Sequence, residues 1–359
     1  MRIRAERDDL ADVLTRAGRG VGTRSPLPIL QGLLCEVEGG TLRVTGTDTE
    51  VTVRTSVDVE VLSEGRTVIP ARLASEAVRK LPPGAVTIDA SDGEVEITGS
   101  GPRFKLRELK VDDFPEIVEP DLGPGVDVDG AELLEAISQV GVAASTDEAR
   151  PTLTGVLFEA EDDHLRVVAT DSYRLAVRDL NGLAPSDTSL VPYRALRELS
   201  RTIGDGKWNM AFGSREARFR SDLGSVTVRL IEAAFPNYRQ LLPEGYPYQL
   251  KVEKAALQEA VGRASLVAED HIPVRLGLTA GGLELSVIRQ EVGEEAEHVP
   301  GEYNGEEMTV AFNTKYLTDG LAAAKGDEVV LETVDPLKPG LLRGAASDDF
   351  RYLLMPVRL

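Results

Sequence analysis

The sequence contains few of the residue types that most often form disulfides, bind metals or act in catalysis. Its 359 residues include one cysteine, one tryptophan and three histidines. A single cysteine excludes a disulfide framework within the chain. The histidines, His164, His271 and His298, are scattered without HxxxH or HExxH spacing, so we expect no zinc or other metal site.

Long apolar runs are missing as well. No window approaches 18 consecutive apolar residues, and residues 1–7 lack the apolar stretch of a signal peptide. We therefore expect a cytoplasmic protein with no membrane partner. Cys35 lies in the apolar, strand-like stretch 29–37, which predicts a buried and inert thiol rather than a nucleophile.

Motifs for nucleotide chemistry are absent, since no GxxxxGK[ST] or GxGxxG lies between a strand and a helix. Thr170, Asp171 and Arg174 resemble a catalytic cluster, but a turn stabilised by Asp171 explains them better. A basic recognition helix and a zinc finger are also missing, which argues against a transcription-type DNA binder. We therefore predict no catalysis and no cofactor.

Basic residues are outnumbered, with 40 Lys and Arg against 60 Asp and Glu and a formal net charge of −20. A uniformly acidic surface would repel nucleic-acid phosphates. The charge is uneven, however, because the six predicted helical segments, counted over 6–20, 72–81, 130–144, 194–203, 253–267 and 314–325, hold thirteen basic and eleven acidic residues. If these helices share one surface, it is mildly positive; the alternative is that their basic residues only solvate helix faces.

The sequence does contain a threefold repeat. Its anchors are LRVTGTD at 42–48 and LRVVATD at 165–171, TVIPARL at 67–73 and SLVPYRA at 189–195, and Phe114-Pro115 and Phe235-Pro236, with fainter third copies at 283–286 and 310–313. The first pair of anchors is 123 residues apart. Solenoid repeats span only about 20 to 50 residues, so each copy should be a domain with its own core.

Each copy predicts the same order of elements. Apolar residues at i, i+3, i+4 and i+7 predict an amphipathic helix near its start, and a second helix follows. Alternating stretches such as 51–59 have the period of half-buried antiparallel strands. Two helices against antiparallel sheets in each domain indicate the α+β class. The predicted helices are 7–19, 71–81, 131–144, 194–203, 254–267 and 314–324, and the later strand regions are 85–98, 217–230 and 328–342.

Stretches containing proline and glycine separate the three copies, at 120–124 and 243–247. We therefore expect domains at 1–120, 125–244 and 247–359.

Four segments carry a resemblance that spans the chain in order: Leu27-Pro28-Ile29-Leu30, ATDSYRLA at 169–176, Phe235-Pro236-Asn237-Tyr238 and YLLMPVRL at 352–359. With these, the sequence resembles the bacterial DNA polymerase III beta subunit family, the replication sliding clamps. The resemblance implies that two chains join head to tail into a ring-forming homodimer of six similar DNA-clamp domains. Helices would line the hole, and sheets would form the outer wall.

The resemblance also implies the partners. The ring would encircle double-stranded DNA without sequence preference and tether the DNA polymerase III alpha subunit, conferring processivity. The clamp loader, other polymerases and repair proteins would dock through short linear peptides. Two alternatives stay open: a clamp paralogue with a specialised role, such as inhibitor resistance, and a monomeric binding protein of the same fold.

The family's peptide pocket lies between the second and third domains, and a concave apolar patch with a polar rim suits peptide anchoring. Gln240 stands where related clamps often carry arginine, and His271 where an aromatic residue is common, so peptide preference should differ. By itself, the run 353–356 also fits an ordinary edge strand. The resemblance implies a pocket wall of Leu153, Thr170, Ser172, Tyr173, Arg174, Leu175, Pro236, Leu241, His271, Asn313, Tyr316, Leu337, Pro339, Leu353, Leu354, Met355, Pro356, Val357, Arg358 and Leu359.

DNA contacts are implied for loop and helix arginines, with two more added on charge grounds. Asp147 and Glu148 make one of these loops more acidic than a phosphate contact would require, so its role stays open. The expected contacts are Arg24, Arg72, Arg150 and Arg194 from the family, and Arg197 and Arg201 from charge.

The ring joint is implied to pair the first domain of one chain with the third domain of another. Residues 103–107 alternate basic and apolar, and opposite charge patterns at the two ends favour head-to-tail pairing. The alternative is that Phe104 and Leu106 are simply core residues. The expected interface residues are Arg103, Phe104, Leu106, Leu266, Glu294, Glu295 and Glu297.

Overall fold

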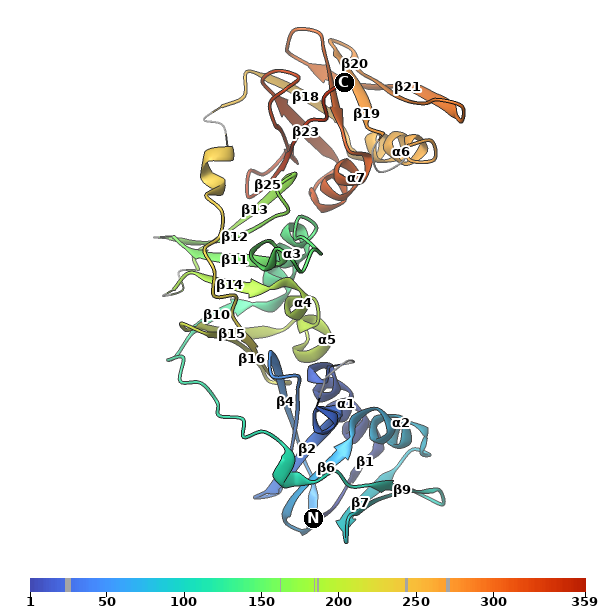
Figure 1. Ribbon diagram of the computed structural model, residues 1–359, viewed down its shortest axis with the longest axis vertical. Helices are drawn as coiled ribbons and strands as arrows, with labels where there is room; N and C mark the ends of the chain where they lie inside the picture. Colours follow the sequence, from blue (N-terminus) through green and yellow to red (C-terminus); the bar gives the residue numbers. More distant parts are fainter. Residues whose placement is uncertain (23–26, 162, 184, 186, 243–244, 269–271) are drawn as a thin grey trace. The chain divides into compact units, whose positions relative to one another are not determined.

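A computed structural model describes residues 1–22, 27–161, 163–183, 185, 187–242, 245–268 and 272–359 (Figure 1). The chain divides into two compact units. The N-terminal unit comprises Met1–Leu134 and Arg194–Leu230, and the C-terminal unit comprises Glu135–Tyr193 and Ile231–Leu359. Both units combine helices with antiparallel sheets, so the predicted α+β class is confirmed.

The three sequence repeats have closely similar element orders: a strand, a helix, several strands, a second helical segment and three more strands. The first contains β1 (Arg2–Glu6), α1 (Arg7–Ala17), β2 (Gly32–Glu38), β3 (Thr41–Thr47), β4 (Val51–Asp58), β5 (Glu60–Ser63), β6 (Gly65–Pro70), α2 (Ala71–Lys80), β7 (Ala85–Ser91), β8 (Glu94–Thr98) and β9 (Arg103–Arg107).

As far as their residues are described, the second and third repeats follow the same plan without a counterpart of β5. The second contains β10 (Val126–Asp129), α3 (Gly130–Gly141), β11 (Gly155–Ala160), β12 (His164–Thr170), β13 (Arg174–Asn181), β14 (Ser189–Pro192), α4 (Tyr193–Leu196), α5 (Leu199–Ile203), β15 (Lys207–Phe212), β16 (Glu216–Ser221) and β17 (Gly224–Arg229). The third contains β18 (Tyr248–Glu253), α6 (Lys254–Ala264), β19 (Val274–Thr279), β20 (Gly282–Arg289), β21 (Gly293–Tyr303), β22 (Met308–Phe312), α7 (Thr314–Ala323), β23 (Glu328–Thr333), β24 (Gly340–Gly344) and β25 (Phe350–Leu354).

One prediction of a single continuous helix is wrong. The segment 194–203 is divided into the short helices α4 and α5. The backbone N–H of Glu198 donates to the carbonyl of Ala195, three residues back, at 3.2 Å, so the four-residue ladder of an α-helix is interrupted there.

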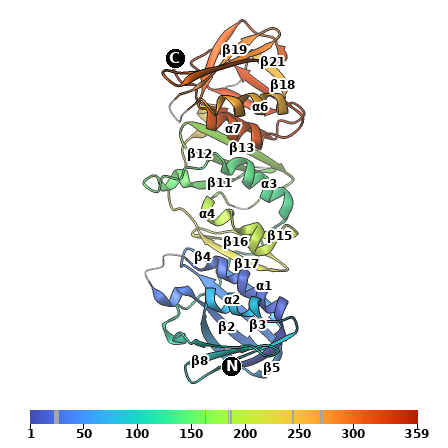
Figure 2. The same ribbon diagram turned by 90° about the vertical axis from the view of Figure 1, so that its right-hand side faces the viewer.

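The N-terminal unit contains a five-stranded sheet, β5-β1-β7-β8-β9, and an eight-stranded sheet, β10-β15-β16-β17-β4-β3-β2-β6. The eight-stranded sheet joins two repeats, because Val226 of β17 pairs with Val53 of β4. Figure 2 shows α1 and α2 in front of the strands of the first repeat. Leu10 and Leu14 of α1 are fully buried in that core, and each contributes roughly 2 kcal/mol by removing apolar surface from water.

The C-terminal unit contains a twelve-stranded sheet, β14-β11-β12-β13-β25-β24-β23-β18-β21-β20-β19-β22. Its second-repeat strands and third-repeat strands meet where β13 pairs with β25, with Leu175 opposite Leu353. Helices α6 and α7 pack against one another beside this sheet (Figure 1). The pairing of β13 with β25 brings the chain's last strand to the middle of the sheet.

The strongest sequence repeat encodes one local structure. Asp48 Oδ1 accepts hydrogen bonds from the backbone N–H groups of Glu50 and Val51 at 2.9 and 2.7 Å. In the second copy, Asp171 Oδ1 accepts from the N–H groups of Tyr173 and Arg174 at 2.9 and 3.1 Å. The predicted turn at Asp171 is therefore confirmed.

The prediction of a buried cysteine is also confirmed. Cys35 is 2% exposed on the inner face of β2. Burial, with a smaller contribution from the charge of Glu36, raises the pKa of the thiol to about 12. In the part of the chain that the structure describes, no helix has both the length and the apolar character needed to cross a bilayer.

Candidate functional site

The last residues of the chain are fixed to the C-terminal unit by backbone hydrogen bonds. Beyond β25, the N–H of Met355 donates to the carbonyl of Tyr173 at 2.9 Å. The N–H of Val357 donates to the carbonyl of Ala311, in β22, at 2.8 Å. The tail 355–359 therefore runs from the turn before β13 toward the strand before α7, and residues from both repeats surround it.

A buried arginine connects these elements. Arg174 is only 7% exposed, and its Nε donates to Asp171 Oδ2 at 2.9 Å. One Nη1 atom donates to Asp319 Oδ2 of α7 at 2.5 Å and to the Tyr352 hydroxyl of β25 at 3.3 Å. Burial opposes the charge, but Tyr352, Asp319 and Asp171 raise the pKa of the guanidinium above its ordinary value. A turn, a helix and the last strand are thus held by one permanently charged side chain.

Aromatic contacts continue the cluster toward solvent. Tyr173 stacks on Tyr316 with ring centroids 6.4 Å apart, and the Arg174 guanidinium carbon lies 4.3 Å from the Tyr316 centroid. Asn313 caps α7 by accepting a hydrogen bond from the Tyr316 N–H at 3.1 Å. Tyr316 is therefore positioned from three directions: its helix cap, its stacked ring and the buried arginine.

The implied pocket wall separates into a buried layer and exposed side chains. Fully or nearly buried members are Leu153, Thr170, Arg174, Leu175, Leu353 and Leu354. Half-buried members are Asn313, Tyr316, Pro339, Pro356 and Val357, and exposed polar or proline members are Ser172, Pro236 and Arg358. His271 lies outside the described residues. The exposed large apolar members are Tyr173, Leu241, Leu337, Met355 and Leu359, which we call the tail surface.

The tail surface holds an unusual share of exposed apolar side chains. Among the described residues, thirteen large apolar side chains are exposed, and five of them belong to this surface. The same unit holds a buried cluster that includes Leu175 and Leu353 of the implied wall, together with Tyr238 and Leu341. Exposed apolar groups over a rigid apolar base are the usual make-up of a surface that binds another protein.

Sequence reasoning missed two charged residues that build this region. Asp319 lies one helical turn after Tyr316 on α7, and this i, i+3 spacing could have placed it beside the same side chains. Arg239 pairs with Glu161 and donates to Glu159 Oε2 at 2.8 Å, and the Tyr238 hydroxyl also donates to Glu159. These bonds hold the 3-10 turn Tyr238–Leu241, which carries Leu241, against β11. No local pattern could have predicted a contact 80 residues away in sequence.

The expected DNA-contacting arginines that the structure describes are exposed, and Arg72, Arg150, Arg194 and Arg201 each face a carboxylate. Arg24 lies outside the described residues. Arg197 is exposed on the turn between α4 and α5. The ion pairs are Arg72–Glu76 at 2.9 Å, Arg150–Asp147 at 3.0 Å, Arg194–Asp48 at 3.6 Å and Arg201–Glu198 at 3.8 Å. Asp147 thus neutralises the arginine of its own loop.

The expected joint residues occupy contrasting positions. Strand β9 is an edge of the five-stranded sheet, and Phe104 and Leu106 on it are half-buried against the first core. Arg103 is exposed on the same strand. Leu266, just beyond α6, is 84% exposed. One face of β9 is thus a core face, while its outer backbone edge has no strand beside it in the described chain.

The acidic members of the expected joint lie on β21. Glu297 accepts two hydrogen bonds at 2.8 Å from Arg263, which hold the pKa of its carboxyl below the ordinary value. Burial, followed by the charge of Glu297, raises the pKa of Glu295. Glu294 is exposed. Within the residues described, no group of three or more His, Cys, Asp and Glu side chains is arranged to hold a metal ion.

Comparisons with known proteins agree along the whole chain. Three family models match in order: the N-terminal domain of the DNA polymerase III beta subunit at 1–118, its central domain at 127–237 and its C-terminal domain at 239–358. The beta sliding clamp of Streptomyces coelicolor is 33% identical over 375 aligned positions that cover 100% of both chains.

Two further relatives extend this likeness. The beta sliding clamp homolog GriR of Streptomyces muensis is 30% identical and covers 100% of this chain and 99% of its own. The crystal structure of a Pseudomonas aeruginosa sliding clamp, the DNA polymerase III subunit beta bound to griselimycin, has a TM-score of 0.94 and 30% identity, with 100% of both chains covered. By its three domains and by the fold of each of its units, this chain belongs to the DNA polymerase III beta subunit family, the bacterial sliding clamps.

Proposed function

We propose that two copies of this chain join head to tail into a ring that encircles duplex DNA and tethers a polymerase to it. The observation that carries the proposal is that three clamp domains fill one chain, which is then half of a six-domain ring. A ring holds DNA by enclosure, so it needs no base-specific contact. We place the domain boundaries at 1–120, 125–244 and 247–359, with proline-containing linkers between them.

The proposed ring joint brings β9 of one chain against the third-domain end of another. Its support is an edge strand at one end and exposed Leu266 at the other, with basic Arg103 and acidic Glu294 as complementary charges. The half-buried Phe104 and Leu106 would stiffen the edge strand by packing inward, while its backbone pairs outward. Backbone pairing of strands would hold the joint together, and the opposite charges at the two ends would favour the head-to-tail arrangement.

The proposed DNA surface is made by Arg24, Arg72, Arg150, Arg194, Arg197 and Arg201. Exposed ion pairs such as Arg72–Glu76 contribute only about 0 to 1 kcal/mol, so a DNA phosphate can replace the carboxylate at little cost. The same carboxylates keep the net attraction weak. Weak, replaceable contacts suit a protein that must slide along DNA.

The tail surface is the proposed docking site for short linear peptides. Its partners would be the DNA polymerase III alpha subunit, the clamp loader, and other polymerases and repair proteins. The five exposed apolar side chains among the implied wall residues support this role, and so does the arginine-centred cluster that positions Tyr173 and Tyr316. The protein would act in the cytoplasm as a non-catalytic accessory subunit, without a cofactor.

A specialised paralogue is the second candidate function. The likeness to the GriR homolog supports this candidate. So do Gln240 and His271, where the resemblance implies an arginine and an aromatic residue. A replicative clamp should support processive synthesis by the organism's own polymerase III. A specialised paralogue should do so poorly while resisting a clamp-binding inhibitor such as griselimycin.

Two experiments test the main proposal. Light scattering should give about twice the chain mass of 38.7 kDa, whereas a monomeric binding protein would give the single mass. After loading, the protein should stay on closed circular DNA and leave when the circle is cut. Equal release from closed and linear DNA would contradict enclosure.

A further inference from the structure

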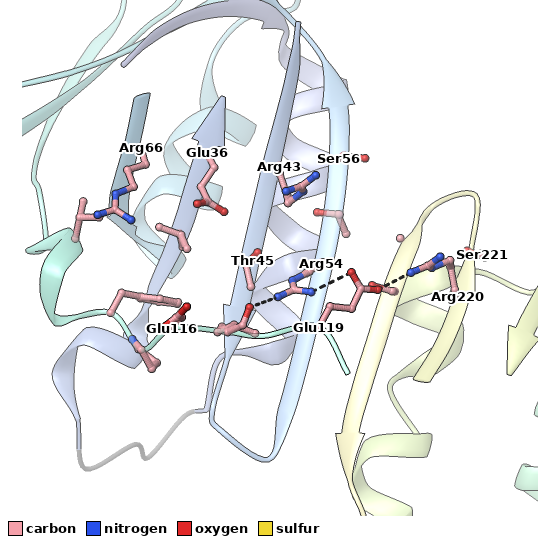
Figure 3. Close-up of a pocket in the computed structure, with 18 of the residues that line it drawn as sticks. Glu36, Arg43, Thr45, Arg54, Ser56, Arg66, Glu116, Glu119, Arg220 and Ser221 are labelled. Carbon is pink, nitrogen blue, oxygen red and sulfur yellow. Dashed lines mark hydrogen bonds and ion pairs between the residues drawn. The ribbon is translucent and has the colours of Figure 1, made fainter. Parts of the chain in front are cut away.

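A polar cavity of about 880 Å³ lies on one face of the eight-stranded sheet (Figure 3). Thr55 of β4 donates to the Val13 carbonyl of α1 at 3.0 Å, so its neighbour Arg54 points to the opposite face of the sheet, where the cavity lies. The segment 115–122, which we call the strap, belongs to the connection from the first repeat to the second and forms one wall of the cavity. Carboxylates and guanidinium groups both line the cavity, so the strap rests against charged side chains.

The strap is fixed at its two ends but has few backbone contacts between them. Phe114, just before it, is 8% exposed, and the carbonyl of Pro124, just after it, accepts a hydrogen bond from Asn209 at 3.0 Å. In the described chain, no backbone group of 115–122 bonds to another backbone group. Val118, in the middle of the strap, is 74% exposed. Side chains must therefore hold the strap against the sheet.

One carboxylate and three arginines hold the middle of the strap. Glu119 of the strap accepts a hydrogen bond from Arg220 at 2.5 Å. The same carboxylate lies 3.5 Å from Arg54 and 3.6 Å from Arg218. Arg54 also donates to the Ile117 carbonyl at 2.7 Å. Figure 3 shows Arg54 and Arg220 reaching Glu119 from two sides.

Strand register explains why one carboxylate reaches two arginines. Arg220 of β16 lies opposite Ser225 of β17, and Ser225 lies opposite Arg54 of β4. The three side chains therefore form a row on one face, with the two arginines two strands, or roughly 10 Å, apart. The small serine side chain between them leaves room for Glu119. This carboxylate thus bridges β4 of the first repeat and β16 of the second.

The bridge depends on charge. The side chain of Arg218 is 10% exposed and its Nε has no hydrogen-bond partner among the described residues, so Glu119 supplies its counter-charge. Without Glu119, three guanidinium groups would face one another across the seam of β4 and β17. The Glu119 side chain is itself 44% exposed, so salt in the solvent can screen its ion pairs.

The connection between the second and third repeats is held differently. Phe235, Leu242 and Tyr246 of that connection pack against a buried apolar cluster, and Tyr238 is a member of the cluster with 3% exposure. Salt does not screen apolar contacts of this kind. The two connections should therefore respond differently to ionic strength.

We propose that the strap is a salt-released clasp between the first and second repeats. In its closed form, Glu119 ties the two repeats together on the sheet face opposite to α1. When the ion pairs of Glu119 are broken, the strap leaves the sheet and the backbone pairing of β4 with β17 opens more often. High ionic strength thus loosens the joint between the first and second repeats and leaves the joint between the second and third unchanged.

A nitroxide spin label at Val118→Cys measures the motion of the strap in the full chain, since Cys35 is buried and takes up no label. A slow component should dominate the spectrum at 50 mM salt. At 1 M salt the ratio of mobile to slow label should rise at least about threefold, because salt screens exposed ion pairs. Glu119→Gln should give the same rise at 50 mM salt.

Two controls match this design. Glu116→Gln removes the same charge from the strap, but Glu116 has no ion pair among the described residues. A label at Asn237→Cys, an exposed position in the second connection, should not respond to salt. Hydrogen–deuterium exchange tests the seam separately: peptides covering 51–54 and 225–228 should exchange at least about threefold faster in Glu119→Gln than in Glu116→Gln.

A strap label that is already mobile at 50 mM salt, or that ignores 1 M salt, would refute the clasp. An equal effect of Glu116→Gln, or an equal response of the label at position 237, would do the same by showing a general effect of charge or salt. Faster strap motion with unchanged exchange at the seam would refute the tie between the repeats. Neither measurement requires a ring or DNA, so the result is independent of the proposed clamp function.

Discussion

Arg174 is the residue on which the candidate site depends most. It is charged and 7% exposed, and such a group is tolerated only where its donors are satisfied. Asp171, Asp319 and Tyr352 supply acceptors, and the Tyr316 ring covers the guanidinium face. Because these partners come from a turn, a helix and a strand, the side chain fixes the local geometry as well as balancing charge.

Replacing Arg174 by methionine should therefore destabilise the protein. The carboxylates of Asp171 and Asp319 would lose their buried partner, which typically costs about 3 to 5 kcal/mol. Urea unfolding followed by circular dichroism measures the change. Arg72→Met, an exposed arginine with a single surface ion pair, is the control and should shift stability by less than about 1 kcal/mol. Equal stability of the two variants would show that the buried network contributes nothing.

The Cys35 thiol should be unreactive in the folded protein. With a pKa raised to about 12, its reactive thiolate is roughly one part in ten thousand at pH 8 and grows about tenfold per pH unit below pH 12. Burial also blocks the reagent. Labelling with a chromogenic disulfide at pH 8 should be slow in buffer and complete within minutes in 6 M guanidinium, and fast labelling of the folded chain would contradict the burial of β2.

At the scale of elements, the tail is a structural extension of β25. Its backbone hydrogen bonds to Tyr173 and Ala311 fix its course, while the side chains of Met355 and Leu359 stay exposed. The turn at Asp171 and the capped start of α7 present their aromatic residues to the same place. The tail, the turn at Asp171 and the start of α7 thus each contribute apolar or aromatic side chains to this region.

Deleting Met355 to Leu359 should abolish binding of a polymerase-derived clamp peptide, measured by calorimetry. The deletion removes two exposed apolar side chains of the tail surface but leaves β25 and its pairing with β13 intact. The mass in light scattering should stay that of the full-length protein, which separates loss of docking from loss of assembly. Unaltered peptide affinity would place the docking site elsewhere.

At the scale of the whole molecule, exposed arginines are neutralised by carboxylates close to them. The chain is strongly acidic, yet the described arginines proposed to meet DNA are exposed. Arg72 and Arg150 each face one carboxylate, and Arg194 faces two. The net field at such pairs is small, and salt weakens it further. This arrangement favours passage along DNA over tight binding.

Removing two of those carboxylates should make the protein hold DNA more tightly. In a Glu76→Gln, Asp147→Asn double variant, Arg72 and Arg150 lose their acidic partners and become available to phosphates. Affinity for a 30-base-pair duplex at 50 mM salt should rise severalfold, with a steeper salt dependence. Glu60→Gln and Asp163→Asn control for net charge, because these carboxylates pair with Arg4 and His164 rather than with a proposed DNA residue. The same rise in that double variant would indicate a general charge effect.

Local pattern predicted much of the architecture. The helical spacing of Leu10 and Leu14 and the alternation in β4 depend on neighbours in sequence, so they were readable directly. The turn at Asp171 was readable because its hydrogen bonds span three residues. The partners that Arg174 finds in Asp319 and Tyr352, and those of Arg239, could not be predicted, because they lie about 80 to 180 residues away in sequence.

The sequence by itself determined that there are three copies of one domain, in what order their helices and strands run, and to which family they belong. Only the tertiary structure decided how the copies share their sheets. Strands β15 to β17 of the middle copy join the first copy through β4, while β11 to β14 join the third through β25. Period-two alternation specifies which face of a strand is buried, but it does not specify which strand will pair with its edge.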